Sequence, residues 1–104
     1  GIHLRLPGYG ADGPTLEIFQ YNTELERGAS VPNRPGYGHI AFAVEDVRQA
    51  LEAVVAVGGG TIGDVVSADI PGAGRITFVY ATDPEGNIIE LQQWSPAGVG
   101  AEGK

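Results

Sequence analysis

The chain has 104 residues, of which 42% are hydrophobic and 18% are charged, so we expect one small globular domain and not a disordered chain. The formal net charge of -7 argues against a nucleic-acid partner, because phosphate binding needs a basic patch. The absence of cysteine excludes disulfides, thiolate metal ligands and cysteine nucleophiles. No apolar run is long enough to cross a membrane and no signal-peptide pattern is present, so we expect a cytoplasmic protein without a membrane partner.

The first part of the chain predicts a β-hairpin. Residues 2–6 (IHLRL) alternate apolar and polar side chains up to a proline, and residues 15–22 (TLEIFQYN) alternate again after a glycine-rich turn. Leu16 and Ile18 share one face of the second strand, and Glu17 lies on the other. A hairpin of this kind is marginal on its own, and its edge invites pairing with another chain. We therefore expect a homodimer, or a longer parent protein, to cover it.

A second strand-forming stretch, residues 37–44 (YGHIAFAV), leads directly into a helix. Ile40, Phe42 and Val44 alternate along it, which predicts one buried face and leaves His39 on the opposite face.

The helix is predicted from a change of period to three and four residues. Asp46 suits its N-cap, with Gln49 placed to complete a capping box, and Gly58 suits its C-cap. The apolar stripe expected to pack on the preceding strand consists of Val47, Ala50, Leu51, Val54 and Val57.

Three more strands are predicted after the helix, at residues 61–67, 75–82 and 88–94, with a loop at 68–74 and a tight turn (DPEGN) between the last two. The fold class is therefore α+β. We divide the chain into a hairpin at 1–22, a linker at 23–36, a strand–helix–three-strand module at 37–95 and a frayed tail at 96–104.

An internal repeat relates the hairpin to the end of the module. Residues 12–21 (DGPTLEIFQY) resemble residues 85–94 (EGNIIELQQW), so that Glu17 aligns with Glu90 and Tyr21 with Trp94. The hairpin therefore corresponds to the last two strands of the module that follows it.

Glu17, His39 and Glu90 form the candidate site. Each lies on the strand face opposite the large aliphatic side chains. A carboxylate in an otherwise apolar strand is costly to bury without a partner, and a divalent cation supplies one partner for all three groups. Two carboxylates and an imidazole suit Zn, Ni, Mn, Fe or Co.

The alternative hypothesis is that the histidine is only hydrogen-bonded and the glutamates are solvated. Because three such groups share one face, we give the metal-site hypothesis the same weight as this alternative.

The sequences GHIAFAVEDV and DPEGNIIEL resemble the vicinal oxygen chelate superfamily, which includes glyoxalase I, methylmalonyl-CoA epimerase, extradiol dioxygenases and bleomycin-resistance proteins. This resemblance implies paired βαβββ modules whose mixed sheets curl around a metal site. Here it implies one full module preceded by the last two strands of another. The opening strand and helix of the first module, with one histidine ligand, are then expected to be missing before residue 1.

The resemblance also implies roles for individual residues. His39 and Glu90 would be the metal ligands of the second module, and Glu17 the carboxylate ligand of the first. The cation would bind both oxygens of a small substrate and stabilise an enediolate, with Glu17 or Glu90 moving the proton. Side chains implied to contact substrate are the aromatic Phe19, Tyr21 and Trp94 and, for an anionic end, Arg5 or Arg75.

Four hypotheses about the function remain. A metal-dependent isomerase or lyase of the glyoxalase I or epimerase type leads, because all three expected ligands are present. A metal-free antibiotic-binding protein of the bleomycin-resistance type is the alternative, and an inactive remnant is a third. An extradiol dioxygenase is disfavoured, since those enzymes usually take two histidines and the glutamate from one module.

Overall fold

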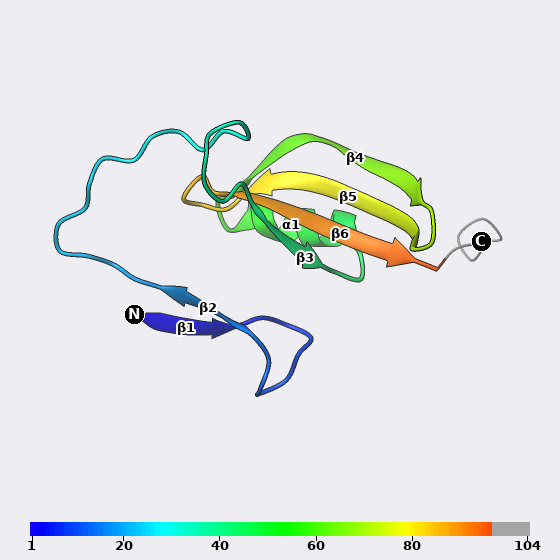
Figure 1. The fold of residues 1–104 in the computed structure, drawn as a ribbon, viewed down its shortest axis with the longest axis horizontal. Helices are drawn as coiled ribbons and strands as arrows, with labels where there is room; N and C mark the ends of the chain where they lie inside the picture. Colours follow the sequence, from blue (N-terminus) through cyan, green and yellow to red (C-terminus); the bar gives the residue numbers. More distant parts are fainter. Residues whose placement is uncertain (97–104) are drawn as a thin grey trace.

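The computed structural model describes residues 1–96, which form one helix and six strands. In chain order these are β1 (Ile2–Arg5), β2 (Thr15–Ile18), β3 (Ile40–Ala43), α1 (Val47–Ala56), β4 (Gly60–Ile70), β5 (Gly74–Thr82) and β6 (Ile88–Ser95). The strands make a two-stranded sheet, β1–β2, and a four-stranded sheet (Figure 1). The predicted α+β architecture, a hairpin followed by a complete βαβββ module, is therefore confirmed. The tail prediction falls mostly on residues 97–104, which lie outside the described residues.

The four-stranded sheet has the order β3-β6-β5-β4. β4, β5 and β6 follow one another as an antiparallel meander, whereas β3 pairs in parallel with β6. Figure 1 shows the long strands β4, β5 and β6 curving past α1. The parallel pairing of β3 with β6 matters for function, because it brings the residue preceding β3 to the start of β6, close to Glu90.

The hydrophobic core lies between α1 and this sheet. Its buried centre is Val47, Val79 and Leu91, one residue each from α1, β5 and β6. Around it pack the partly buried Phe42, Val44, Ala50, Leu51, Val54, Val65 and Ile89.

Two residues expected in the core are exposed. Ile40, at the start of β3, is 46% exposed, and Val57 is 71% exposed because it is already the C-cap of α1 and no longer part of the helix.

Both ends of α1 are capped as the sequence predicts. The Asp46 carboxylate accepts hydrogen bonds from the backbone N–H groups of Arg48 and Gln49, at 3.0 and 3.1 Å. At the other end Gly58 has a φ of 106°, and two bonds close a Schellman motif, from Gly58 N–H to the Val55 carbonyl and from the next N–H to the Val54 carbonyl. The other half of the expected capping box, a hydrogen bond from the Asp46 backbone N–H to the Gln49 side chain, is not formed within residues 1–96.

The predicted loop at 68–74 is mostly strand. β4 continues to Ile70 and β5 begins at Gly74, because the ladder between them is held by cross-strand side-chain pairs. The Arg75 guanidinium lies 2.9 Å from the Asp69 carboxylate, and the Ser67 and Thr77 hydroxyls are 2.9 Å apart. The stretch predicted as a loop is therefore a turn only at residues 71–73, and cross-strand pairs on an exposed sheet face flank this turn.

The hairpin β1–β2 stands apart as its own small sheet (Figure 1). Its register pairs Ile2 with Ile18 and Leu4 with Leu16, so the aliphatic side chains share one face, and Ile2 and Leu4 are 64% and 48% exposed. The second strand ends at Ile18 and not at residue 22 as predicted, since β1 offers no partner beyond its own first residue.

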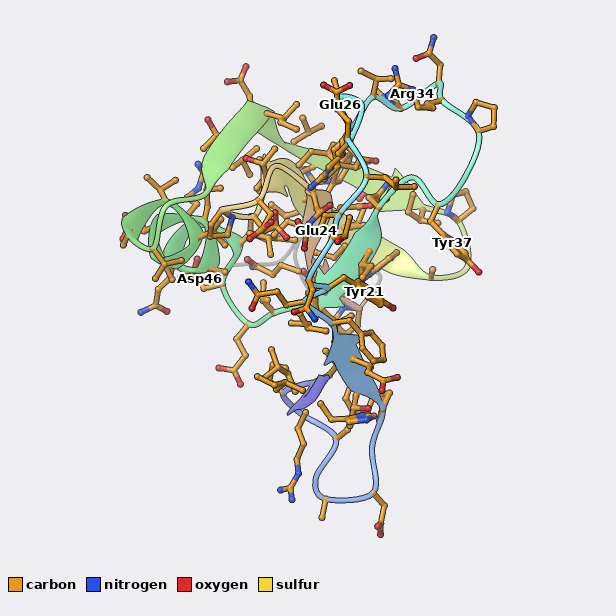
Figure 2. The ribbon with its side chains drawn as sticks, turned by 90° about the vertical axis from the view of Figure 1, so that its left-hand side faces the viewer. Tyr21, Glu24, Glu26, Arg34, Tyr37 and Asp46 are labelled. Carbon is orange, nitrogen blue, oxygen red and sulfur yellow. The ribbon has the colours of Figure 1, made fainter. Side chains whose placement is uncertain are left out.

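A long irregular connector joins the hairpin to the module. Figure 2 shows Glu24, Glu26, Arg34 and Tyr37 spaced along it. Arg27 fastens it to the β5–β6 turn, donating to the Asn87 side chain at 2.6 Å and to the Glu85 carbonyl at 3.0 Å. No helix among the described residues is long and apolar enough to cross a membrane.

Candidate functional site

The site is centred on His39 and Glu90. Because β3 pairs in parallel with β6, with Ala41 opposite Glu90, the residue just before β3 reaches the same part of the sheet. The His39 Nε2 atom lies 3.0 Å from Glu90 Oε1. Glu90 is 7% exposed, although its neighbours Ile89 and Leu91 occupy the core side of β6. A carboxylate buried to this degree needs polar partners, and the imidazole is one of them.

Two further side chains hold this pair in place. The ring of Tyr80, which lies opposite Glu90 on β5, meets the His39 ring edge-on with centroids 5.1 Å apart. On the other side of the carboxylate, Gln92 Nε2 donates to Glu90 Oε2 at 3.0 Å. Both Glu90 oxygens are therefore occupied, one by His39 and one by Gln92.

Neither Tyr80 nor Gln92 was expected at the site from the sequence. Gln92 could have been found from the period of two along β6, which places it on the face of Glu90. Tyr80 required the register of β5 with β6, and that depends on the geometry of the DPEGN turn. In this turn Asp83 Oδ1 accepts from the backbone N–H of Glu85 at 3.0 Å and of Asn87 at 2.8 Å.

Glu17 lies in the other sheet and is not joined to His39 and Glu90. Its carboxylate is 3.2 Å from the Nε2 atom of His3, which faces it across the hairpin, and the two side chains are 47% and 61% exposed. The other ring nitrogen of His3 is 3.3 Å from the Thr15 hydroxyl. Residues 1–96 hold no group of three or more His, Cys, Asp or Glu side chains placed to bind one metal ion. The three expected ligands are thus divided between two separate His–Glu pairs.

The aromatic residues implied to shape the pocket are also divided. Phe19 and Tyr21 stack on each other at 6.0 Å just beyond β2 and are 52% and 66% exposed. Figure 2 shows Tyr21 where the hairpin strand passes into the connector. Trp94 lies on β6, and its indole N–H donates to Gln92 Oε1 at 3.0 Å.

The two candidate arginines lie away from the His39–Glu90 pair. Arg75 is engaged by Asp69 near the β4–β5 turn, and along β5 it is five residues from Tyr80, or about 16 Å of extended strand. Arg5 lies at the far end of β1, opposite Thr15.

A cavity of about 770 Å³ lies beside His39. Its walls come from the hairpin (Leu16 and Ile18), the connector, the start of β3 and the β5–β6 turn, and its polar groups include His39 and Arg34. This volume is in the range of small-molecule sites. Glu90 is not part of the lining and stands behind His39.

The chemistry of the pair fits a divalent cation. An imidazole nitrogen and a carboxylate oxygen are common ligands of Zn and related metals. Two donors each about 2.1 Å from one ion are about 3.0 Å apart at a right angle and about 3.4 Å apart at the tetrahedral angle, so a separation of 3.0 Å suits shared ligation. His39 and Glu90 are therefore the residues that could hold a metal, as two ligands of a larger set.

Comparisons with known proteins agree with this fold. The family model described as the Glyoxalase/Bleomycin resistance protein/Dioxygenase superfamily matches residues 4–91, and the chain belongs to this superfamily. It is 34% identical over 106 aligned residues to a "Probable lactoylglutathione lyase" of Vibrio parahaemolyticus, covering 96% of this chain and 69% of that protein. A protein of the same name from Vibrio cholerae is 33% identical with the same coverage.

A solved structure shows the same fold. The crystal structure of a glyoxalase family protein from Bacillus cereus superimposes with a TM-score of 0.56 at 24% sequence identity. The match covers 69% of this chain and 46% of that one, so this chain spans less than half of that structure.

Proposed function

We propose that this protein is a metal-dependent isomerase or lyase of the glyoxalase I type, acting on a small substrate with two adjacent oxygen atoms. The observation that carries the proposal is the buried Glu90 carboxylate, held 3.0 Å from the His39 imidazole beside a cavity. The names of the two Vibrio relatives favour lactoylglutathione lyase activity within this class. An epimerase uses the same enediolate chemistry and is the closest variant of the proposal.

The residues of the chain take distinct roles in this proposal. His39 supplies a nitrogen ligand whose ring is steadied by Tyr80, and Glu90 supplies an oxygen ligand whose second oxygen is engaged by Gln92. When bound, Zn, Ni, Co, Mn or Fe supplies Lewis acidity toward the substrate oxygens. We assign the proton transfer to Glu17, because within residues 1–96 its exposed carboxylate is paired with His3 alone and remains open to a substrate proton.

Glu17 must approach the His39–Glu90 pair for this chemistry. We propose that a homodimer achieves this, with the hairpin of one copy packed against residues 37–95 of the other. The exposed aliphatic face of the hairpin supports the proposal, because burying apolar surface stabilises an interface by about 25 cal/mol per Å².

Thermal unfolding with and without cations tests metal binding. At a free cation concentration of about 100 times Kd, the native state gains about 2.7 kcal/mol, which raises the Tm of a domain this size by about 10–20 °C. His39→Ala should abolish the shift. His3→Ala, the matched control at the only other histidine, should leave it in place.

Activity separates the two glutamates. Glu90→Gln should lose both cation binding and lactoylglutathione lyase activity, since it removes a ligand. Glu17→Gln should keep the cation-dependent shift in Tm and lose activity by a factor of about 10²–10⁴, since it removes only the base. A Glu17→Gln enzyme with full activity would overturn the assignment of the base.

A metal-free binding protein of the bleomycin-resistance type is the second candidate. It is favoured by one observation, that residues 1–96 contain no set of three metal ligands in one place. A Tm unchanged by Zn, Ni, Co and Mn would decide for it and against the metal-dependent enzyme.

A further inference from the structure

A continuous chain of hydrogen bonds runs along one face of β6 and ends at His39. The Trp94 indole N–H donates to Gln92 Oε1 at 3.0 Å, and Gln92 Nε2 donates to Glu90 Oε2 at 3.0 Å. Glu90 Oε1 then lies 3.0 Å from His39 Nε2. The three β6 residues alternate along the strand, so all of them project from the face opposite Leu91.

The direction of this chain follows from the chemistry of its ends. An indole nitrogen only donates, and an ionised carboxylate only accepts. The amide of Gln92 therefore has one consistent orientation, with its oxygen toward Trp94 and its NH₂ group toward Glu90. The opposite orientation would place the carbonyl oxygen against a carboxylate oxygen and leave the indole N–H facing an NH₂ group.

The same chain fixes the carboxylate plane of Glu90. With Oε2 occupied by the Gln92 amide, Oε1 is the oxygen presented to His39. Because Glu90 is buried, rotating it away from Gln92 would leave a polar atom without a partner, which is costly. Gln92 thus decides which carboxylate oxygen is available beside the imidazole.

We infer that Gln92 is a positioning residue for the metal ligand Glu90, and that Trp94 sets the orientation of the Gln92 amide. This inference rests on the proposed function, since it assigns the chain to the preorganisation of the cation site. It gives Trp94 a role different from the substrate contact that the family resemblance implies. Partners of metal ligands typically change metal affinity 10–100-fold when they are replaced.

The experiment uses Gln92→Leu, which replaces the amide with an apolar, branched side chain one atom shorter and so removes the donor. The first readout is the indole ¹⁵N–¹H resonance, which is unambiguous because the chain has one tryptophan. The second is the affinity for Zn and for Ni, measured by calorimetric titration. We expect the indole resonance to move and the affinity to fall 10–100-fold. The Tm in the absence of cation should also fall, because the buried Glu90 Oε2 atom loses its hydrogen-bond donor. The matched control is Gln49→Leu on the exposed side of α1, which should alter neither readout.

Trp94→Phe provides the second variant. It keeps an aromatic ring and removes the indole N–H, so the Gln92 amide loses its fixed orientation and cation affinity should fall in the same direction by a smaller factor. If Gln92→Leu does not fold, this variant decides alone. Unchanged affinity in the folded variants, together with loss of binding in Glu90→Gln, would overturn the positioning role and leave the proposed function standing. Retention of binding in Glu90→Gln would overturn both.

Discussion

Two antiparallel hairpins of this chain carry the same pattern in different surroundings. In β1–β2 the carboxylate of Glu17 faces His3 across the ladder, and in β5–β6 Glu90 faces Tyr80. The Glu17 side chain is 47% exposed, whereas that of Glu90 is 10% exposed. The difference comes from the neighbours, because β6 is flanked by β3 and backed by the core under α1. Strand pairing determines which residues face each other. Only the pair on β5 and β6 is buried, because β3 and α1 cover that part of the sheet.

The largest expected effect is on the free energy of unfolding, which should depend on a leucine in the core and not on a leucine in the connector. Leu91→Ala should lower the free energy of unfolding by about 2–5 kcal/mol, because Leu91 is 4% exposed and its removal leaves a cavity. The matched control is Leu25→Ala, where the side chain is 93% exposed and the change should stay within about 0.5 kcal/mol. Urea denaturation measures both, and equal losses would contradict the placement of the core.

A second experiment asks whether the bare hairpin is covered in solution. Sedimentation at micromolar concentration should give the mass of a dimer, and Ile18→Asp should weaken dimerisation by about 1.5–3 kcal/mol per copy, because an aliphatic contact is lost. Thr23→Asp, in the connector, is the charge-matched control and should leave the mass unchanged. A monomer with a protected hairpin in hydrogen exchange would contradict the dimer.

The smallest of the three effects concerns α1, the helix that covers the β5–β6 hairpin and is absent from the β1–β2 hairpin. Asp46→Ala removes two hydrogen bonds at the N-cap of α1 and should lower the free energy of unfolding by about 1 kcal/mol. Asp64→Ala, on the exposed part of β4, should cost much less. If both variants unfold at the same urea concentration, the cap does not stabilise the helix.

Most of the fold could be predicted from local patterns. The change from a period of two to a period of three or four identified β3 and α1, and Asp46 and Gly58 marked the ends of the helix. The loop between β4 and β5 was predicted too long. Cross-strand pairs such as Asp69 with Arg75 extend both strands, and the local composition does not reveal such pairs.

The site was predictable to the extent that it depends on alternation and on the internal repeat. These placed His39 and Glu90 on the face away from the aliphatic residues, and the structure brings them to 3.0 Å. The same alternation along β6 also places Gln92 beside Glu90. Tyr80, in contrast, depends on the register of β5 with β6, which local sequence patterns do not determine. That Glu17 takes part in the site stays a prediction, since its distance from Glu90 depends on how the hairpin is packed.

The central claim is that His39 and Glu90 hold a divalent cation. Anomalous diffraction at the zinc edge, from crystals grown with Zn, tests it most directly. The account predicts a peak about 2.0–2.2 Å from both His39 Nε2 and Glu90 Oε1. A peak confined to the exposed His3–Glu17 pair, or no peak at either pair under saturating Zn, would contradict it.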